Sequence, residues 1–186
     1  IPIDQMDLHW EVFRWPSKMH QEMANVEKNL RLMEHNKQTE MEEEQSDFAQ
    51  DLSVLQGDVA RLKSLTQLAD ASVNAENVRR IKKTIAEYEE RARLFNSREG
   101  LFGSVTTDYA IISEQTRVFE PFYDLWDCAD RWLSNKETWT NGAFLDLDPE
   151  AVEGAVGTLL RNLNKSGKTF ERLGLSQCNV IAFQVR

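Results

Sequence analysis

The feature that most constrains the fold of this chain is the absence of proline between Pro16 and Pro121. Over the same span, apolar residues recur in alternating steps of four and three, which is the spacing of one face of an α-helix. Two such stripes are Met19, Met23, Val26, Leu30 and Met33, followed by Phe48, Leu52, Leu55, Val59 and Leu62. Because proline ends or kinks helices, its absence together with this period predicts long helices that pack along one face.

The two stripes do not share one heptad frame. Met33 and Phe48 are one residue further apart than two heptads would place them. We expect the apolar seam to shift, or its packing to relax, between them. The intervening run Glu40-Met41-Glu42-Glu43-Glu44-Gln45 is typical of a solvated helix face, and a docking surface or cation site is the alternative.

A long helical hairpin is predicted for residues 17–97. The residue before a proline disfavours helix, and proline suits a first helical turn, so the first long helix is expected to start after Trp15-Pro16. Residues 1–16 would then be the end of a preceding segment. Residues 70–75 break the pattern, with Asn74 as the N-cap of a second helix. Two long helices joined by a short turn lie antiparallel.

Residues 98–175 are predicted to form a compact, aromatic-rich helical bundle. Its centre is the stretch from Phe119 to Phe144, which holds Trp126, Trp132 and Trp139. Large aromatic side chains dominate core energetics, so we expect a packed core here. A partly exposed surface for another domain or chain is the alternative, because tryptophan and tyrosine are enriched at the energetic centres of interfaces.

Local signals predict the borders of the elements in that bundle. We expect a loop over residues 96–107, then a helix capped by Asp108. Pro121 would kink that helix or divide it in two. A second loop is expected over residues 134–147.

The last long helix has a strong start signal at Asp148-Pro149-Glu150, and Gly174 is expected to end it. Residues 176–186 would begin the next element. The predicted fold class is therefore all-α, an elongated antiparallel helical bundle with a long helix hairpin.

The charge of the chain argues against several classes of partner. Its formal net charge is −9, which disfavours nucleic acid, an anionic membrane surface and direct binding to an acidic polymer such as a microtubule. Residues 1–60 and 101–148 are net acidic, whereas residues 61–100 and 149–186 are net basic. This alternation suits elements that fold back on one another. The chain starts at Ile1 without an initiator methionine, and we expect it to be a piece of a longer protein.

One short motif is similar to the end of a phosphate-binding loop, namely Ser166-Gly167-Lys168-Thr169. Such a loop needs an earlier glycine where this chain has Asn162, and it must lie between a strand and a helix. Residues 159–163 are instead helical in pattern. We therefore expect a surface helix turn and no nucleotide site.

Other candidate groups lack the spacing that catalysis or metal binding requires. The three histidines are His9, His20 and His35. They show no metal-ligand spacing. Four neighbouring carboxylates are Glu42, Glu43, Glu44 and Asp47. No apolar residues surround them to build a general acid–base pocket. Cys128 and Cys178 are expected to be buried, reduced thiols. We predict no catalytic, cofactor-binding or metal-binding residue in this chain.

Several short motifs follow one another along the middle and C-terminal part of the chain. They are Phe95-Asn96-Ser97-Arg98-Glu99, Leu101-Phe102-Gly103, Phe119-Glu120-Pro121-Phe122, Leu125-Trp126, Trp132-Leu133, Trp139-Thr140-Asn141-Gly142 and the helix from Asp148 to Phe170. Their order and spacing resemble the dynein heavy chain where its helical tail meets its linker. The resemblance is closer to axonemal (ciliary) dyneins than to cytoplasmic ones. Ala143 departs from it, because many members of the family have proline there.

The resemblance implies a mechanical, non-catalytic role. In this family the linker bends across an ATPase ring, and the adjoining helices would transmit that movement to the tail of an ATP-driven microtubule motor. The nucleotide and microtubule sites of the family lie elsewhere, so ATP and magnesium would bind other parts of the parent chain.

The implied partners are the rest of the heavy chain, including its ATPase ring, and other dynein or axonemal subunits. The implied location is the axoneme of a cilium or flagellum, with the cytoplasm or cytoskeleton as the alternative. From another class of function, a spectrin-like or coiled-coil scaffold that recruits protein partners is the competing hypothesis.

Overall fold

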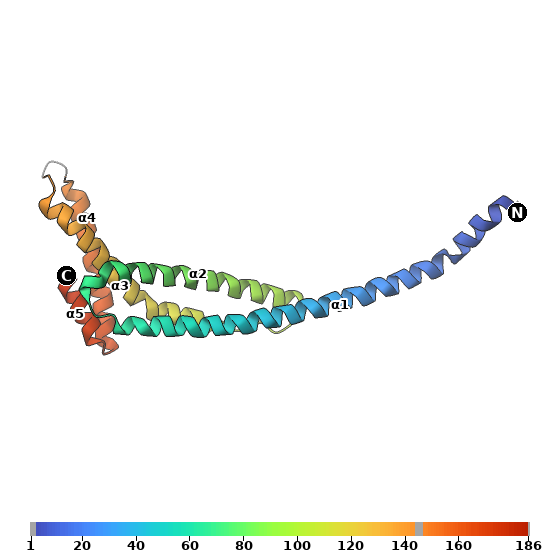
Figure 1. Cartoon of the computed structure of the whole chain (residues 1–186), viewed down its shortest axis with the longest axis horizontal. Helices are drawn as coiled ribbons and strands as arrows, with labels where there is room; N and C mark the ends of the chain where they lie inside the picture. Colours follow the sequence, from blue (N-terminus) through green and yellow to red (C-terminus); the bar gives the residue numbers. More distant parts are fainter. Residues whose placement is uncertain (1–2, 144–146, 186) are drawn as a thin grey trace.

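The computed structural model describes residues 3–143 and 147–185, and these form five α-helices and two short 3-10 helices. The α-helices are α1 (Ile3–Arg61), α2 (Ala71–Leu101), α3 (Ala110–Asn141), α4 (Pro149–Arg172) and α5 (Ser176–Val185). No β-strand occurs among the described residues, and the predicted all-α class is confirmed. Figure 1 shows an elongated molecule, with α1 as a long arm and with α4 and α5 gathered at the other end.

α1 is a single helix of 59 residues that passes through Pro16. At ~1.5 Å per residue it is roughly 88 Å long. The predicted helix start after Trp15-Pro16 is wrong, because the helix begins at Ile3. Proline inside a helix removes one backbone hydrogen bond and bends the axis, and α1 is bent near its N-terminal end (Figure 1). The division of the chain into domains stays a prediction.

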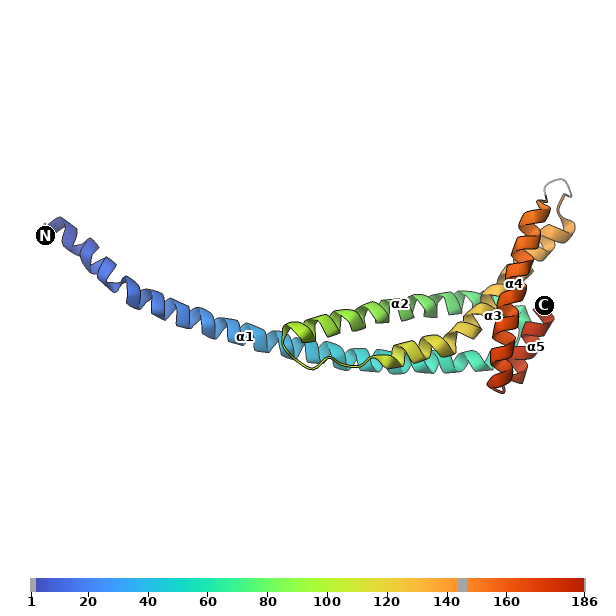
Figure 2. The same cartoon turned by 180° about the vertical axis from the view of Figure 1, so that it is seen from behind.

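The second half of α1 packs antiparallel to α2, and α3 lies alongside both (Figure 2). The turn between α1 and α2 contains the two short 3-10 helices, Leu62–Ser64 and Leu68–Asp70. Two ion pairs fix the antiparallel register. Arg91 Nη1 lies 2.8 Å from Asp51 Oδ2, and further along α2 Arg98 pairs with Glu44.

The acidic run on α1 does not interrupt the helix. Met41 is 4% exposed and Gln45 is half-buried, so these two residues continue the packing face of α1 from the first apolar stripe to Phe48. The shift predicted from the spacing is therefore absorbed within a continuous helix. Glu42 and Glu43 are exposed, as expected of a solvated face.

Three predicted helix borders are wrong by one or two turns. α2 begins at Ala71, and Asn74 lies buried in its first turn instead of capping it. α2 also extends to Leu101, so the loop expected from Asn96 begins only at Phe102. α3 extends to Asn141, and the first half of the expected loop over residues 134–147 is helical. Local sequence signals are only a weak guide to where a helix begins and ends.

α3 begins with the help of Asp108, whose Oδ1 accepts a hydrogen bond from the backbone N–H of Ala110 at 2.8 Å. Pro121 lies inside α3 and is buried, but it does not divide the helix. The predicted helix thus exists as one element.

The start and end of α4 are as predicted. Asp148 Oδ1 accepts from the backbone N–H groups of Glu150 and Ala151 at 3.0 and 3.2 Å. Gly174 has a φ of 69°, which is the left-handed conformation that terminates helices. In this turn the N–H of Leu175 donates to the carbonyl of Phe170 at 2.9 Å, and the chain then reverses into α5.

The predicted aromatic core is confirmed for the first half of the Phe119–Phe144 stretch. Phe122 and Trp126 are fully buried, and the ring centroids of Phe122 and Phe170 lie 5.2 Å apart where α3 meets α4. Trp132 and Trp139 are only half-buried and pack on each other, with ring centroids 6.3 Å apart. Phe144 lies outside the described residues.

Candidate functional site

The motif that is similar to a phosphate-binding loop lies inside α4. Ser166 and Gly167 are buried, whereas Lys168 is exposed. A Cβ atom on Gly167 would lie 3.2 Å from Asn179 Oδ1 of α5, so this glycine allows α4 and α5 to approach closely. Backbone N–H groups inside a helix are bonded to the preceding turn and cannot wrap a phosphate. The motif packs helices together.

The histidines and carboxylates singled out in the sequence are not brought together. His9, His20 and His35 are all exposed along α1. Among the described residues, no group of three or more histidine, cysteine, aspartate or glutamate side chains could hold a metal ion. Over the same residues, no helix is both long enough and apolar enough to cross a membrane.

Cys128 and Cys178 are buried free thiols, as predicted. Burial raises the pKa of the Cys128 thiol to about 11 and also raises the pKa of Cys178. Nucleophilic chemistry needs the thiolate, which is scarce in such a site at neutral pH. Both cysteines therefore act as packing residues.

A charge cluster joins α2 to α3, and we call it the Arg79 cluster. Arg79 Nη2 donates to Asp127 Oδ1 at 2.8 Å and to Asp130 Oδ2 at 2.9 Å. Asp127 is buried, and its other oxygen lies 2.8 Å from Arg131 Nε. The hydrogen bond between Arg79 and Asp127 raises the pKa of the Arg79 guanidinium most, and the hydrogen bond to Asp130 raises it further. The cluster fastens α2 to the middle of α3.

A second polar cluster, which we call the Glu99 cluster, joins α1, α2 and the loop before α3. Glu99 is 3% exposed, and its Oε1 accepts from Gln45 Nε2 at 2.7 Å and from the Thr107 hydroxyl at 2.5 Å. Its Oε2 accepts from the backbone N–H of Thr107 at 2.8 Å. These bonds hold the loop against the end of α2.

Comparison with known proteins gives the family of the chain. The chain is 30% identical over 193 residues to Dynein axonemal heavy chain 1 of Mus musculus, covering 98% of this chain. It is 25% identical over 171 residues to Dynein axonemal heavy chain 12 of Rattus norvegicus, covering 90% of this chain. The chain is a dynein heavy chain segment. It spans 4% and 5% of the lengths of these two relatives. No family model and no solved structure matches it.

In this dynein segment, the motif from Phe95 to Glu99 has a structural role. Phe95 is buried against α1, Arg98 pairs with Glu44, and Glu99 holds the loop. With its amide nitrogen turned toward the loop, Asn96 donates to the carbonyl of Thr107 at 2.9 Å. One turn of α2 therefore fixes both the hairpin and the path into α3.

An aromatic cluster that the sequence did not single out lies at the same level. The ring centroid of Phe48 lies 5.4 Å from that of Tyr88 and 5.5 Å from those of Phe95 and Tyr109. The Arg91 guanidinium carbon lies 4.6 Å from the centroid of the Phe48 ring. Phe48 lies on an apolar stripe of the sequence, but only the fold brings the rings of Tyr88, Phe95 and Tyr109 to it.

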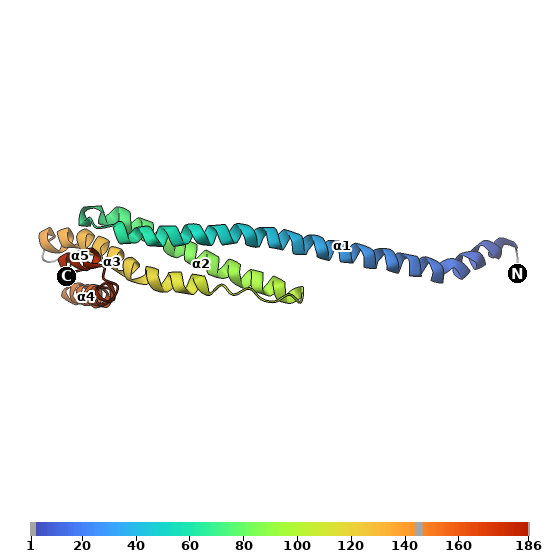
Figure 3. The ribbon, with the colours of Figure 1, turned by 90° about the horizontal axis from the view of Figure 1, so that it is seen from below.

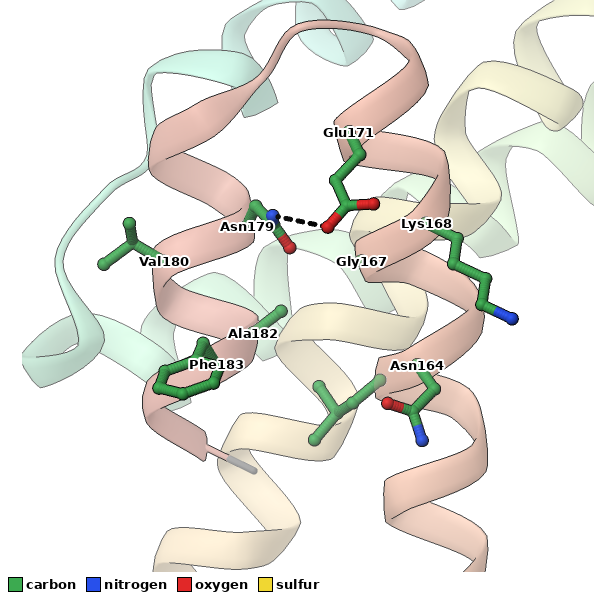
Figure 4. A pocket seen from close by; sticks show the side chains of 9 residues that line it. Asn164, Gly167, Lys168, Glu171, Asn179, Val180, Ala182 and Phe183 are labelled. Carbon is green, nitrogen blue, oxygen red and sulfur yellow. Dashed lines mark hydrogen bonds between the residues drawn. The ribbon is translucent and has the colours of Figure 1, made fainter.

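A groove with a volume of about 610 Å³ lies between α4 and α5 in this dynein segment. Figure 4 shows that Glu171 and Asn179 meet across it, where Asn179 Nδ2 donates to Glu171 Oε1 at 3.3 Å, while Lys168 points away. Val180 and Phe183 of α5 are exposed beside it. The charged residues that line this groove are Lys168 and Glu171.

Replacing Glu99 with glutamine is expected to make the stability of the segment less dependent on pH in acid. Burial by itself would raise the pKa of Glu99, but the hydrogen bonds from Thr107 and Gln45 outweigh it and hold the pKa below the ordinary value of 4.5. A carboxylate with a lowered pKa stabilises the fold above its unfolded pKa, and this contribution is lost as the pH falls through the folded value.

Urea unfolding of the wild type and of Glu99→Gln at neutral pH and at several pH values below 4.5 measures this difference. The variant should be less stable at neutral pH by about 1–3 kcal/mol, and the gap should close in acid. Glu42→Gln removes an exposed carboxylate of α1 and serves as the matched control. A gap that stays constant across the range would contradict the assigned role of Glu99.

Proposed function

We propose that this chain is a non-catalytic mechanical segment of an axonemal dynein heavy chain, which joins tail to linker and transmits force in an ATP-driven microtubule motor. The observation that carries the proposal is the Arg79 cluster. It fastens the long α1–α2 hairpin to α3, and α3 packs in turn on α4 and α5. A load applied along the hairpin would reach the other end of the segment through the Arg79 cluster.

The form of the hairpin supports a load-bearing role. Helices resist force along their axes because every turn is hydrogen-bonded to the next. Ion pairs join α1 to α2, and the Phe48 ring packs against Tyr88 of α2 and against Tyr109 just before α3. The second half of α1 would therefore move together with α2 and α3 as one body.

The proposed partners are the rest of the heavy chain, including its ATPase ring, and other dynein or axonemal subunits. The names of the relatives support a place in the axoneme of a cilium or flagellum. In this proposal ATP and magnesium bind elsewhere in the parent chain. This segment would bind neither nucleic acid, membrane nor the microtubule directly, in keeping with its net charge of −9.

Replacing Arg79 with alanine in the full-length heavy chain is expected to slow microtubule gliding while microtubule-stimulated ATPase activity is kept. The change leaves Asp127 buried with one cationic partner fewer and removes the ion pair between Arg79 and Asp130. Because Arg79 is about half-exposed, solvent screening limits the loss of stability to about 1–2 kcal/mol. The contact between α2 and α3 would loosen without unfolding of the segment. The gliding speed and the ATPase rate can both be measured on the same preparation.

The matched control is Arg80→Ala, on the same turn of α2. Arg80 is exposed, and its Nη2 donates to Asn77 Oδ1 of the same helix at 2.9 Å, without a link to another helix among the described residues. This variant should glide at the wild-type speed. If Arg79→Ala abolished ATPase activity, or if both variants glided normally, the force-transmitting role would be wrong.

A scaffold that recruits protein partners is the second candidate function, and the exposed apolar face of α1 is the observation that favours it. The two functions predict different sequences further along the parent chain. A motor predicts several nucleotide-binding modules, whereas a scaffold predicts further heptad-rich helices. The sequence of the parent protein distinguishes them.

A further inference from the structure

Residues 8–37 of α1 have no neighbouring helix among the residues that the structure describes. Every side chain from Leu8 to Lys37 is exposed, and Figure 3 shows this part of the helix extending alone beyond the hairpin. Eight of these side chains are large and apolar and lie on one face: Leu8, Val12, Trp15, Met19, Met23, Val26, Leu30 and Met33. Single exposed apolar residues are ordinary, but a continuous row of them marks an interaction surface.

This row continues an interface that the hairpin already uses. At about 100° per residue, its members and the buried residues from Met41 to Val59 fall on the same side of α1. α2 ends at Leu101, close to the level of Met41, since Arg98 pairs with Glu44. The face is therefore the same helix-packing surface, and it is uncovered beyond the C-terminal end of α2 and the N-terminal end of α3.

The charges along the row indicate what kind of helix fits it. Between residues 17 and 36, the charged side chains that flank the row are acidic, with Glu22 along one edge and with Glu27 and Glu34 along the other. Lys37, the next position on the face itself, pairs with Glu40 of the same helix. The basic residues Lys28 and Arg31 lie toward the opposite side of the helix, from which Arg31 reaches Glu27 at 2.5 Å. A partner would place basic side chains beside these edges.

We infer that the Met19–Met33 face of α1 is covered by an amphipathic helix from another segment of the same dynein heavy chain. That helix would carry apolar residues in steps of three and four, with lysine or arginine along both edges. The heavy chain relatives are long enough to supply it, because this chain spans only 4% of Dynein axonemal heavy chain 1. The inference rests on the family and not on the force-transmitting role.

A second copy of this chain is a poor occupant of the same face. Both edges of the row are acidic, so two copies would bring glutamates beside glutamates whether the helices ran parallel or antiparallel. Like charges at the flanking positions of paired helices disfavour the pairing. A partner of opposite edge charge is required.

Carboxyl-to-amine coupling without a spacer, followed by mass spectrometry, tests the inference on the full-length heavy chain. We expect Glu22, Glu27 or Glu34 to be linked to lysines of another segment of the same chain. The pair Glu120–Lys165, whose charged atoms lie 3.0 Å apart, is an internal control for the coupling reaction. Links to lysines of a second copy or of another subunit would overturn the inference, as would linkage at the control pair alone.

A double variant, Met23→Asp with Leu30→Asp, tests the same face by its apolar contacts. Both residues are exposed in this segment, so the hairpin itself should stay folded. The links from the acidic edges should fall by about tenfold or more, because two buried apolar contacts are lost. Val54→Asp, at an exposed position of α1 away from the row, is the control and should leave the links unchanged. Unchanged links in the double variant would show that the face is not covered.

Discussion

Replacing Trp126 with alanine is expected to lower the free energy of unfolding of this segment by about 3–5 kcal/mol. Trp126 is the largest fully buried side chain of the segment, and it lies on α3 beside the other buried residues Phe122 and Leu125. Its Nε1 has no hydrogen-bond partner among the described residues, so the loss is one of packing and burial. Urea unfolding of the purified segment, followed by circular dichroism, measures it.

Trp132→Ala is the matched control, because it makes the same chemical change six positions further along α3, at a half-buried side chain. It should cost clearly less, since less surface is returned to water. A Trp126 variant as stable as the Trp132 variant would mean that the core is not centred on α3. If Trp132→Ala instead weakened binding to the rest of the heavy chain, its half-exposed ring would belong to an interface.

The long helices could be predicted from the sequence because their signal is local and repeated. The stripe from Phe48 to Leu62 is buried as its period requires, and Asp148 and Gly174 bound α4 in the expected places. The class of fold and the antiparallel hairpin follow from such repeated patterns. Helix ends are set by fewer residues and are more easily overridden. The continuation of α2 past Asn96 depends on bonds to Thr107, which no local pattern shows.

The Arg79 cluster and the Glu99 cluster could not be predicted, because their members are far apart in the sequence. Arg79 and Asp127 are 48 residues apart, and Gln45 and Glu99 are 54 apart. Single charged residues on helix surfaces are common, and only the folded arrangement selects which of them meet. Conversely, the motif at Ser166-Gly167 is similar in sequence to a phosphate-binding loop, although in the structure Gly167 allows the close approach of α4 and α5. The absence of catalytic residues stays a prediction.

Replacing Phe48 with alanine is expected to detach α1 from the rest of the hairpin, at a cost of about 3–5 kcal/mol for the lost side chain. Phe48 is fully buried and contacts the rings of Tyr88, Phe95 and Tyr109, which come from α2 and from the residue before α3. Aromatic pairs contribute about 0.5–1.5 kcal/mol each beyond their burial, so several favourable contacts are lost together. Urea unfolding gives the total, and hydrogen exchange over residues 41–62 locates it.

Phe13→Ala makes the same change on the same helix, at a side chain that is 72% exposed. It should alter the stability of the isolated segment by no more than about 0.5 kcal/mol, because little contact is lost. Fast exchange in α1 with protected α2 and α3 would show that Phe48 is the fastening point between α1 and its neighbours. Loss of protection in all helices at once would instead show that α1 belongs to the same cooperative unit, which the force-transmitting proposal also allows. Equal stabilities for Phe48→Ala and Phe13→Ala would contradict the packing of α1 against α2.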